Sequence, residues 1–276
     1  ATLRVSLSKV VIAVGDSITE GYGSSDLAQN GWVGVLSRCT GSVVRNFGVS
    51  GTTMQKKSDL PYWNTWAYRE ALDSSPDVVY LMLGTNDARD VSWNAAKYRE
   101  DTIAMIQSFL RLSSSPQVYL FAPIPLFADG KNGHMQSVIS FVLPRILQDV
   151  AVESGPRVTY VDAVFNAFGG ADLTCRDCMY SCIGLGGDGI HPTDYGHEQI
   201  AAAVCSSTTD TCRCPVDSAP FIVSGECMSQ LLAHWRILLV VGVVTIYCCF
   251  VFLWCRHQRL QKVQQGTLLI CERRHP

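Results

Sequence analysis

Short runs of hydrophobic residues alternate along the chain with longer stretches in which hydrophobic residues recur at helical spacing. Continuous runs rich in β-branched residues fit strands that are covered on both faces. The pattern predicts five such strands, over residues 10–14, 42–47, 77–83, 117–122 and 157–161. Between and after them it predicts helices over residues 32–38, 63–72, 94–112, 136–153 and 195–205.

This alternation of strands and helices favours an α/β fold with three layers, in which helices cover both faces of a parallel sheet. In open sheets of this kind ligands bind beyond the carboxyl ends of the strands. The residues that follow each predicted strand are therefore the first place to look for a site.

A second pattern begins near the C-terminus, where residues 237–254 read ILLVVGVVTIYCCFVFLW and contain no charged side chain. This length and polarity are typical of a transmembrane helix, and Trp235 and Trp254 stand where interfacial aromatic residues belong. A buried core helix is the alternative. We expect four parts: a folded domain over 1–207, a cysteine-containing stalk over 208–234, a transmembrane helix over 235–255 and a basic tail over 256–276.

The charges on either side of this segment indicate its orientation. Five cationic residues follow it, whereas Arg236 is the one Lys or Arg close before it. The positive-inside rule places the tail in the cytoplasm and the large domain outside the cell or in a lumen. Because no charged and then apolar leader precedes Val10, a tail-anchored protein with a cytosolic domain is the alternative.

Eight cysteines precede the hydrophobic segment, and an even number in clusters suits disulfides in an oxidising compartment. Their pairing cannot be deduced from the sequence. Zinc bound by Cys175, Cys178, Cys182 and one further ligand is the alternative. The eight residues are Cys39, Cys175, Cys178, Cys182, Cys205, Cys212, Cys214 and Cys227.

The overall composition adds one exclusion. Charged residues make up 17% of the chain and hydrophobic residues 47%, and the 22 basic and 24 acidic residues leave a net charge of −2. No basic stripe stands out before residue 255, so nucleic acid is not expected as a partner.

Four short polar segments carry the candidate chemistry. Residues 15–23 (GDSITEGYG), 48–53 (GVSGTT) and 84–87 (GTND) each follow a predicted strand, and residues 188–192 (DGIHP) precede the last helix. A serine needs a base to accept its proton, which His191 can provide for Ser17. Asp188, three residues before His191, can hold the imidazole in the required tautomer.

Together these segments resemble the conserved blocks of the GDSL/SGNH hydrolase superfamily, here in a GDSI form. The resemblance extends from about residue 10 to residue 205. It implies a flavodoxin-like sheet of five parallel strands, with Ser17, Asp188 and His191 as the catalytic residues. It also implies an oxyanion hole formed by the backbone N–H groups of Ser17 and Gly51 and by the side-chain amide of Asn86.

The resulting prediction is a serine esterase that works through an acyl-enzyme and needs no cofactor or metal. Short acyl or acetyl esters are the first expectation for the substrate, either as small molecules or on a glycan, and lipid esters are the second. Tyr22, Trp63, Trp66 and Trp93 are candidates to line the substrate site, although packing explains them equally well. An acyltransferase with the same acyl-enzyme and a catalytically idle, membrane-tethered binding module are the alternatives.

Overall fold

The computed structural model describes residues 9–89, 91, 93–179, 188–209, 212 and 214. The chain divides into Ala1–Ser218 and Ala219–Pro276, and all the described residues belong to the first unit. No helix within the described ranges is long and apolar enough to span a bilayer. The hydrophobic segment 237–254 lies outside the described residues, as do the basic tail and most of the stalk.

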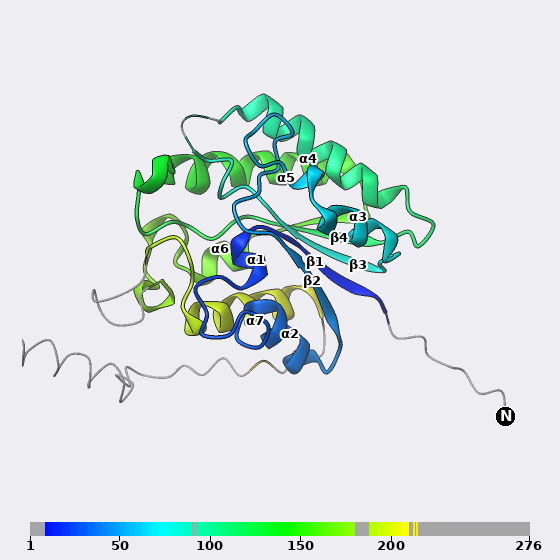
Figure 1. The fold of residues 1–276 in the computed structure, drawn as a ribbon, viewed down its shortest axis with the longest axis horizontal. Coiled ribbons are helices and arrows are strands. Elements are labelled where there is room, and N and C mark those ends of the chain that lie inside the picture. Colours follow the sequence, from blue (N-terminus) through cyan, green and yellow to red (C-terminus); the bar gives the residue numbers. More distant parts are fainter. Residues whose placement is uncertain are drawn as a thin grey trace, which may run out of the picture. The chain divides into compact units, whose positions relative to one another are not determined.

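The centre of the domain is a sheet of five parallel strands in the order β2-β1-β3-β4-β5 (Figure 1). All five predicted strands are confirmed, with ends that differ by at most two residues. Their bounds are β1 Val11–Gly15, β2 Val44–Gly48, β3 Val78–Met82, β4 Gln117–Phe121 and β5 Val158–Val161.

Alternate residues of the strands point into two hydrophobic layers, one on each face of the sheet. Ile12 and Val14 of β1 pack in the first layer with α3 (Trp66–Asp73), α4 (Ala95–Leu110) and α5 (Leu143–Ser154). Ala13 packs in the second layer with α1 (Ser17–Glu20), α2 (Trp32–Thr40), α6 (Ala163–Ala167) and α7 (Asp194–Thr208). Figure 1 shows these two groups of helices on opposite sides of the strands. Since side chains alternate across a strand, burial on both faces explains the continuous hydrophobic runs in the sequence.

The helices correspond in part to the predicted ones. Trp32–Thr40 (α2), Ala95–Leu110 (α4) and Asp194–Thr208 (α7) match, and Ser17–Glu20 (α1) and Ala163–Ala167 (α6) were not predicted. Short 3₁₀ turns occur at Tyr62–Asn64, Lys131–Gly133, Gly170–Asp172 and Arg176–Cys178.

Two predicted helices are not regular α-helices over their whole length: the one over 63–72 is broken at Thr65, whereas the one over 136–153 is helical throughout. Residues 63–72 form a 3₁₀ turn followed by α3 (Trp66–Asp73), because Thr65 caps the new helix by accepting the N–H of Tyr68 at 3.1 Å. Residues 136–153 form a π-helical turn, Val138–Val142, followed by α5 (Leu143–Ser154). Pro144 lies in the first turn of α5, where its missing N–H is tolerated.

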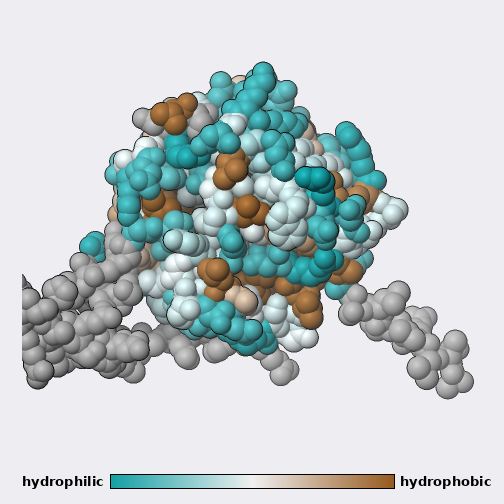
Figure 2. Space-filling view, viewed as in Figure 1, coloured by the Kyte–Doolittle hydropathy of each residue, from teal (hydrophilic) through white to brown (hydrophobic). Residues whose placement is uncertain are grey.

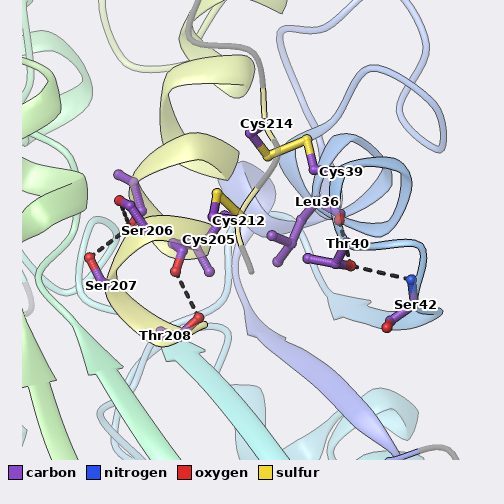
Figure 3. The surroundings of a disulfide bond; sticks show 12 residues. Leu36, Cys39, Thr40, Ser42, Cys205, Ser206, Ser207, Thr208, Cys212 and Cys214 are labelled. Atoms are coloured by element: carbon purple, nitrogen blue, oxygen red, sulfur yellow. Dashed lines mark hydrogen bonds between the residues drawn. A yellow bond between two sulfur atoms is a disulfide. The ribbon is translucent and has the colours of Figure 1, made fainter. Parts of the chain in front are cut away.

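Six described cysteines form three disulfides, as the even cysteine count predicted. Cys39 of α2 pairs with Cys214, and Cys205 of α7 pairs with Cys212 (Figure 3). The third disulfide joins Cys175 to Cys178. Zinc at this last pair was the wrong alternative, because both sulfur atoms are bonded to each other. Cys182 and Cys227 lie outside the described residues.

The register of the sheet brings the polar segments to one edge. Gly15, the last residue of β1, lies level with Gly48 of β2 and Met82 of β3. The loops that follow these three strands therefore begin side by side. The strand order reverses direction next to β1, which is where open α/β sheets bind ligands.

Candidate active site

Ser17 is the first residue of α1, and Asp16 alone separates it from the end of β1. The side chain of Asp16 caps this short helix by accepting the N–H of Ile18 at 3.0 Å. At its other end the N–H groups of Gly21 and Tyr22 both reach the carbonyl of Ser17, at 3.0 and 2.8 Å. The tight turn fixes the serine, whose Oγ lies 3.0 Å from Nε2 of His191.

His191 and Asp188 form a compact unit in the loop before α7. Nδ1 of His191 lies 2.6 Å from Oδ2 of Asp188, while Oδ1 accepts the backbone N–H groups of Ile190 and His191, both at 2.8 Å. An ionised carboxylate only accepts hydrogen bonds, so Nδ1 carries the hydrogen. Nε2 of the neutral ring is therefore the atom that can accept the hydroxyl hydrogen of Ser17.

The electrostatics of Asp188 keep it charged. Burial would raise the pKa of this carboxyl group, but hydrogen bonds from the ring and backbone of His191 and from the backbone of Ile190 outweigh it. They hold the pKa well below its usual range. The side-chain ammonium of Lys131 also donates to the backbone carbonyl of Asp188 at 2.8 Å, which fastens this loop to the neighbouring 3₁₀ turn.

Gly51 lies in a turn that is closed by the N–H of Thr52 and the carbonyl of Val49, 3.4 Å apart. Its φ of +77° is a conformation that glycine adopts without strain. No hydrogen-bond acceptor within the described ranges binds its N–H group. The same is true of the N–H of Ser17, which precedes the first hydrogen bond of its helix.

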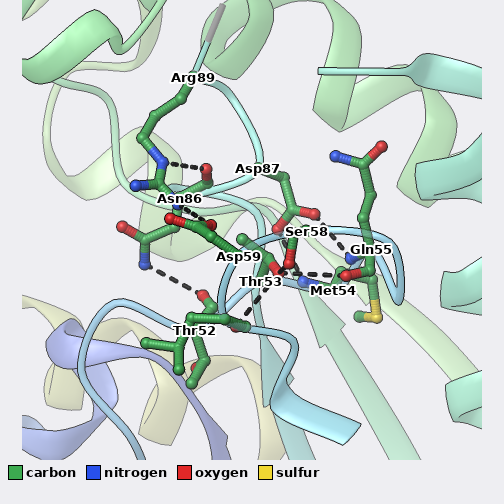
Figure 4. A network of polar contacts seen from close by, with 10 residues as sticks. Thr52, Thr53, Met54, Gln55, Ser58, Asp59, Asn86, Asp87 and Arg89 are labelled. Carbon is green, nitrogen blue, oxygen red and sulfur yellow. Dashed lines mark hydrogen bonds and ion pairs between the residues drawn. The ribbon is translucent and has the colours of Figure 1, made fainter. Parts of the chain in front are cut away.

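Asn86 lies in the loop after β3 and bridges to the Gly51 turn. Its side-chain Nδ2 donates to the carbonyl of Thr52 at 3.1 Å, and its own carbonyl accepts from Nε of Arg89 at 3.0 Å (Figure 4). An amide nitrogen has two hydrogens, so one bond to Thr52 leaves a second donor.

Asp87, to which the sequence assigned no role, is a buried anchor for the segment that follows Gly51. Its carboxylate accepts the backbone N–H groups of Met54 and Gln55, each at 2.8 Å (Figure 4). Burial raises the pKa of Asp87 to about 7, although these bonds favour its charged form. Asp16, also buried, has its pKa raised by burial to about 6.

The four aromatic candidates have different surroundings. Trp63 packs on Tyr68 and donates to the carbonyl of Met54, and Trp93 packs on Tyr98. Trp66 is mostly exposed at the start of α3. Tyr22 has its ring centroid 4.6 Å from that of His191, which makes it the aromatic residue in contact with the Ser17–His191–Asp188 group.

Among the described residues, the possible metal ligands form a single cluster. One group of His, Cys, Asp or Glu side chains has ligand atoms close enough to share an ion, namely Cys205, Cys212 and Cys214. All three are in disulfides.

Comparisons with known proteins fit this arrangement. Residues 13–199 match the model of the GDSL-like Lipase/Acylhydrolase family. An acetylxylan esterase from Xylanibacter ruminicola is 30% identical over 217 residues, which cover 71% of this chain and 42% of the relative. The chain thus spans less than half the length of that relative.

Solved structures share the fold at low identity. A lipase/acylhydrolase from Enterococcus faecalis has a TM-score of 0.56 at 22% identity, over 71% of this chain and 93% of the other. A carbohydrate acetylesterase from Sinorhizobium meliloti has a TM-score of 0.55 at 19% identity, over 72% of this chain and 98% of the other.

Proposed function

The chain belongs to the GDSL-like Lipase/Acylhydrolase family, and from this premise we propose that it is a serine esterase with Ser17 as its nucleophile. The observation that carries the proposal is the continuous hydrogen-bonded series from Ser17 Oγ through His191 to Asp188, at 3.0 and 2.6 Å. A nucleophile next to a base that is itself oriented by a third group is the arrangement that acyl transfer requires.

In the first half of the reaction, Ser17 Oγ attacks the ester carbonyl while Nε2 of His191 takes its proton. Asp188 stabilises the imidazolium ion that forms. His191 then gives the proton to the leaving alcohol, and the acyl group remains on Ser17. In the second half His191 activates a water molecule, which releases the acid and restores the serine.

The negative charge of the tetrahedral intermediate needs donors that are already in place. We assign this role to the N–H groups of Ser17 and Gly51 and to the side-chain amide of Asn86. Supporting this assignment, both backbone N–H groups have no other acceptor among the described residues, and Asn86 is held beside the Gly51 turn by Thr52.

Acetyl or other short acyl esters are the proposed substrates, on small molecules or glycans. The support comes from similarity to an acetylxylan esterase and from the shared fold of a carbohydrate acetylesterase. Lipid esters are the second candidate.

Residues 237–254 support a single-pass membrane anchor after the stalk, with the catalytic domain outside the cell or in a lumen and the basic tail in the cytoplasm.

The direct test is hydrolysis of p-nitrophenyl acetate by purified protein. Ser17→Ala is expected to abolish turnover and to retain the wild-type circular dichroism spectrum. Ser207→Ala, which removes a hydroxyl bonded to the Ala203 carbonyl near the end of α7, is the control and is expected to keep full activity. Turnover by a folded Ser17→Ala protein refutes the assignment.

Two alternatives use the same residues. An acyltransferase would pass the acyl group from Ser17 to an alcohol, so product analysis with added acceptor alcohols distinguishes it from a hydrolase. An idle, membrane-tethered binding module would turn over no ester.

Protease protection in sealed vesicles tests the proposed placement of the catalytic domain outside the cytoplasm.

A further inference from the structure

Tyr22 is an exposed aromatic side chain beside the proposed general base. Its ring meets that of His191 at an interplanar angle of 61°, in an edge-to-face contact, yet 53% of the residue is accessible to solvent. One part of the ring therefore contacts the imidazole, and the rest is free to contact a substrate. No hydrogen bond of its phenol group is found within the described ranges.

A buried histidine of α7, His197, binds the backbone of Tyr22. Nε2 of His197 lies 3.2 Å from the carbonyl of Tyr22, and its Nδ1 lies 3.2 Å from the backbone nitrogen of Trp32. The N–H of Trp32 can only donate and the carbonyl can only accept, so the ring is neutral with its hydrogen on Nε2. Burial agrees with this state because it lowers the pKa of His197 to about 4.

The next residue, Gly23, restrains the backbone on the other side of Tyr22. A Cβ atom added to Gly23 would lie 2.3 Å from the carbonyl oxygen of Pro192 and 3.0 Å from Cβ of His191. The backbone after Tyr22 is therefore pressed against the loop that carries the base. With its backbone fixed and its ring in contact with that of His191, Tyr22 loses little conformational freedom when a ligand binds, which favours affinity.

The reaction itself determines which part of the substrate passes Tyr22. His191 must give its proton to the oxygen of the leaving alcohol, so the alcohol part has to lie next to Nε2. The carbonyl oxygen points instead toward the N–H groups of Ser17 and Gly51. An aromatic ring in contact with His191 consequently borders the alcohol side of the site.

Resting on the esterase function proposed above, we propose that Tyr22 binds the alcohol part of the substrate and that this part is a sugar. A pyranose ring has an apolar face of C–H groups and a rim of hydroxyl groups. It matches an aromatic residue with an apolar body and a polar tip, such as an exposed tyrosine. The ring of Tyr22 offers the face, and its phenol group is available to a sugar hydroxyl.

The test compares two acetyl esters, a monoacetylated methyl xyloside and ethyl acetate, which has no ring to stack. The readout is kcat/KM for the sugar ester divided by kcat/KM for ethyl acetate. Any general effect on His191 lowers both values and cancels in this ratio. In Tyr22→Ala this ratio is expected to fall about tenfold, equivalent to 1.4 kcal/mol. Most of the change is expected in KM for the sugar ester.

Three further variants control the result. Tyr22→Phe keeps the ring and is expected to keep the ratio within about twofold to threefold, whereas Tyr22→Leu keeps bulk without a flat face and is expected to behave like Tyr22→Ala. Phe141→Ala removes an exposed aromatic side chain next to α5, in the other helical layer, and is expected to leave the ratio unchanged.

The possible failures are distinct. If wild-type protein hydrolyses both esters and both Tyr22→Ala and Tyr22→Leu keep the wild-type ratio, the role of Tyr22 is wrong and the esterase function stands. If it hydrolyses ethyl acetate but not the sugar ester, the sugar assignment is wrong. If it hydrolyses neither, the esterase proposal fails, and this inference fails with it.

Discussion

Glu20 accepts two hydrogen bonds from Ser50, one from its backbone N–H at 2.9 Å and a shorter one from its hydroxyl group. Glu20 ends the helix that begins with Ser17, and Ser50 precedes Gly51. This contact therefore ties together the two backbone segments whose N–H groups we assign to the oxyanion hole. Asp87 holds the same loop further along, at Met54 and Gln55.

Glu20→Gln is expected to lower kcat for p-nitrophenyl acetate about threefold to tenfold with little change in KM. Both bonds are accepted by one oxygen, Oε2, which the amide can replace, but the amide carries no charge. A hydrogen bond to a charged group contributes about 1.5–3 kcal/mol, less where it is exposed, and a neutral acceptor contributes less. Glu70→Gln changes an exposed residue of α3 in the same way and is the control. An unchanged kcat in Glu20→Gln contradicts a positioning role.

Asn86→Ala is expected to lower kcat by about 10²–10³, because it removes one donor to the oxyanion. KM should change much less, since the donor acts mainly on the charged intermediate. The carbonyl of Thr52 also loses its partner, so thermal unfolding is measured in parallel. Asn64→Ala, at an exposed site in a 3₁₀ turn, is the control. A folded Asn86→Ala protein with a nearly normal kcat would show that this amide is not an oxyanion donor.

His197 is expected to make folding stability depend on pH. Its pKa is lowered by burial from 6.5 to about 4, so the unfolded chain takes up a proton below pH 6.5 and the folded protein does not until about pH 4. The contribution of neutral His197 to the free energy of unfolding is therefore fully present above pH 6.5 and is lost as the pH falls toward 4. The total loss is about 3 kcal/mol.

The comparison with His197→Asn isolates this contribution, because asparagine does not titrate. Urea unfolding at pH 7.5, 5.5 and 4.5 gives the stability of both proteins. The difference in free energy of unfolding between the wild-type protein and His197→Asn is expected to shrink steadily from pH 7.5 to pH 4.5. A constant difference at all three pH values contradicts the assignment of a neutral, buried His197.

The disulfides are expected to contribute unequally to stability. Cys39–Cys214 closes a loop with a sequence separation of 175, whereas Cys175–Cys178 has a separation of 3. In the chain-entropy model the long loop corresponds to about 5 kcal/mol and the short one to about 2 kcal/mol. Replacing Cys39 and Cys214 by serine should therefore lower the urea midpoint more than replacing Cys175 and Cys178. The reverse order contradicts this expectation.

The sequence was sufficient for the framework of the fold. Burial on both faces gives each strand a continuous hydrophobic run, and Gly15 and Gly84 mark where two of the runs end. In a parallel sheet such ends share one edge. That geometry explains why segments far apart in sequence, with Ser17 and His191 separated by 174 positions, lie together in the structure.

The supporting contacts were not predictable from the sequence, because they depend on pairing between distant residues. No local sequence pattern indicates the contact of Glu20 with Ser50 or that of Asp87 with Met54. The signal for His197 was a histidine on the same side of the last helix as Ile200, Ala201 and Val204. Helix α1, with four residues, and helix α6, with five, are too short to show helical periodicity.

The surface gives no simple guide to the site either. Most of the face in Figure 2 is hydrophilic or neutral in hydropathy, with hydrophobic residues in smaller patches between. Single exposed hydrophobic residues are normal on proteins. The contact between Tyr22 and His191, and not its hydropathy, is what distinguishes Tyr22 from other exposed aromatic residues.

The central claim is that His191 activates the hydroxyl group of Ser17, and labelling with a fluorophosphonate probe tests it most directly. Mass spectrometry of the labelled wild-type protein should find the probe on Ser17, with none on Ser17→Ala. His191→Ala should react at least about 10²-fold more slowly, because the serine has lost its base. Failure of the folded wild-type protein to react, or labelling of another residue at the same rate in Ser17→Ala, would contradict the account.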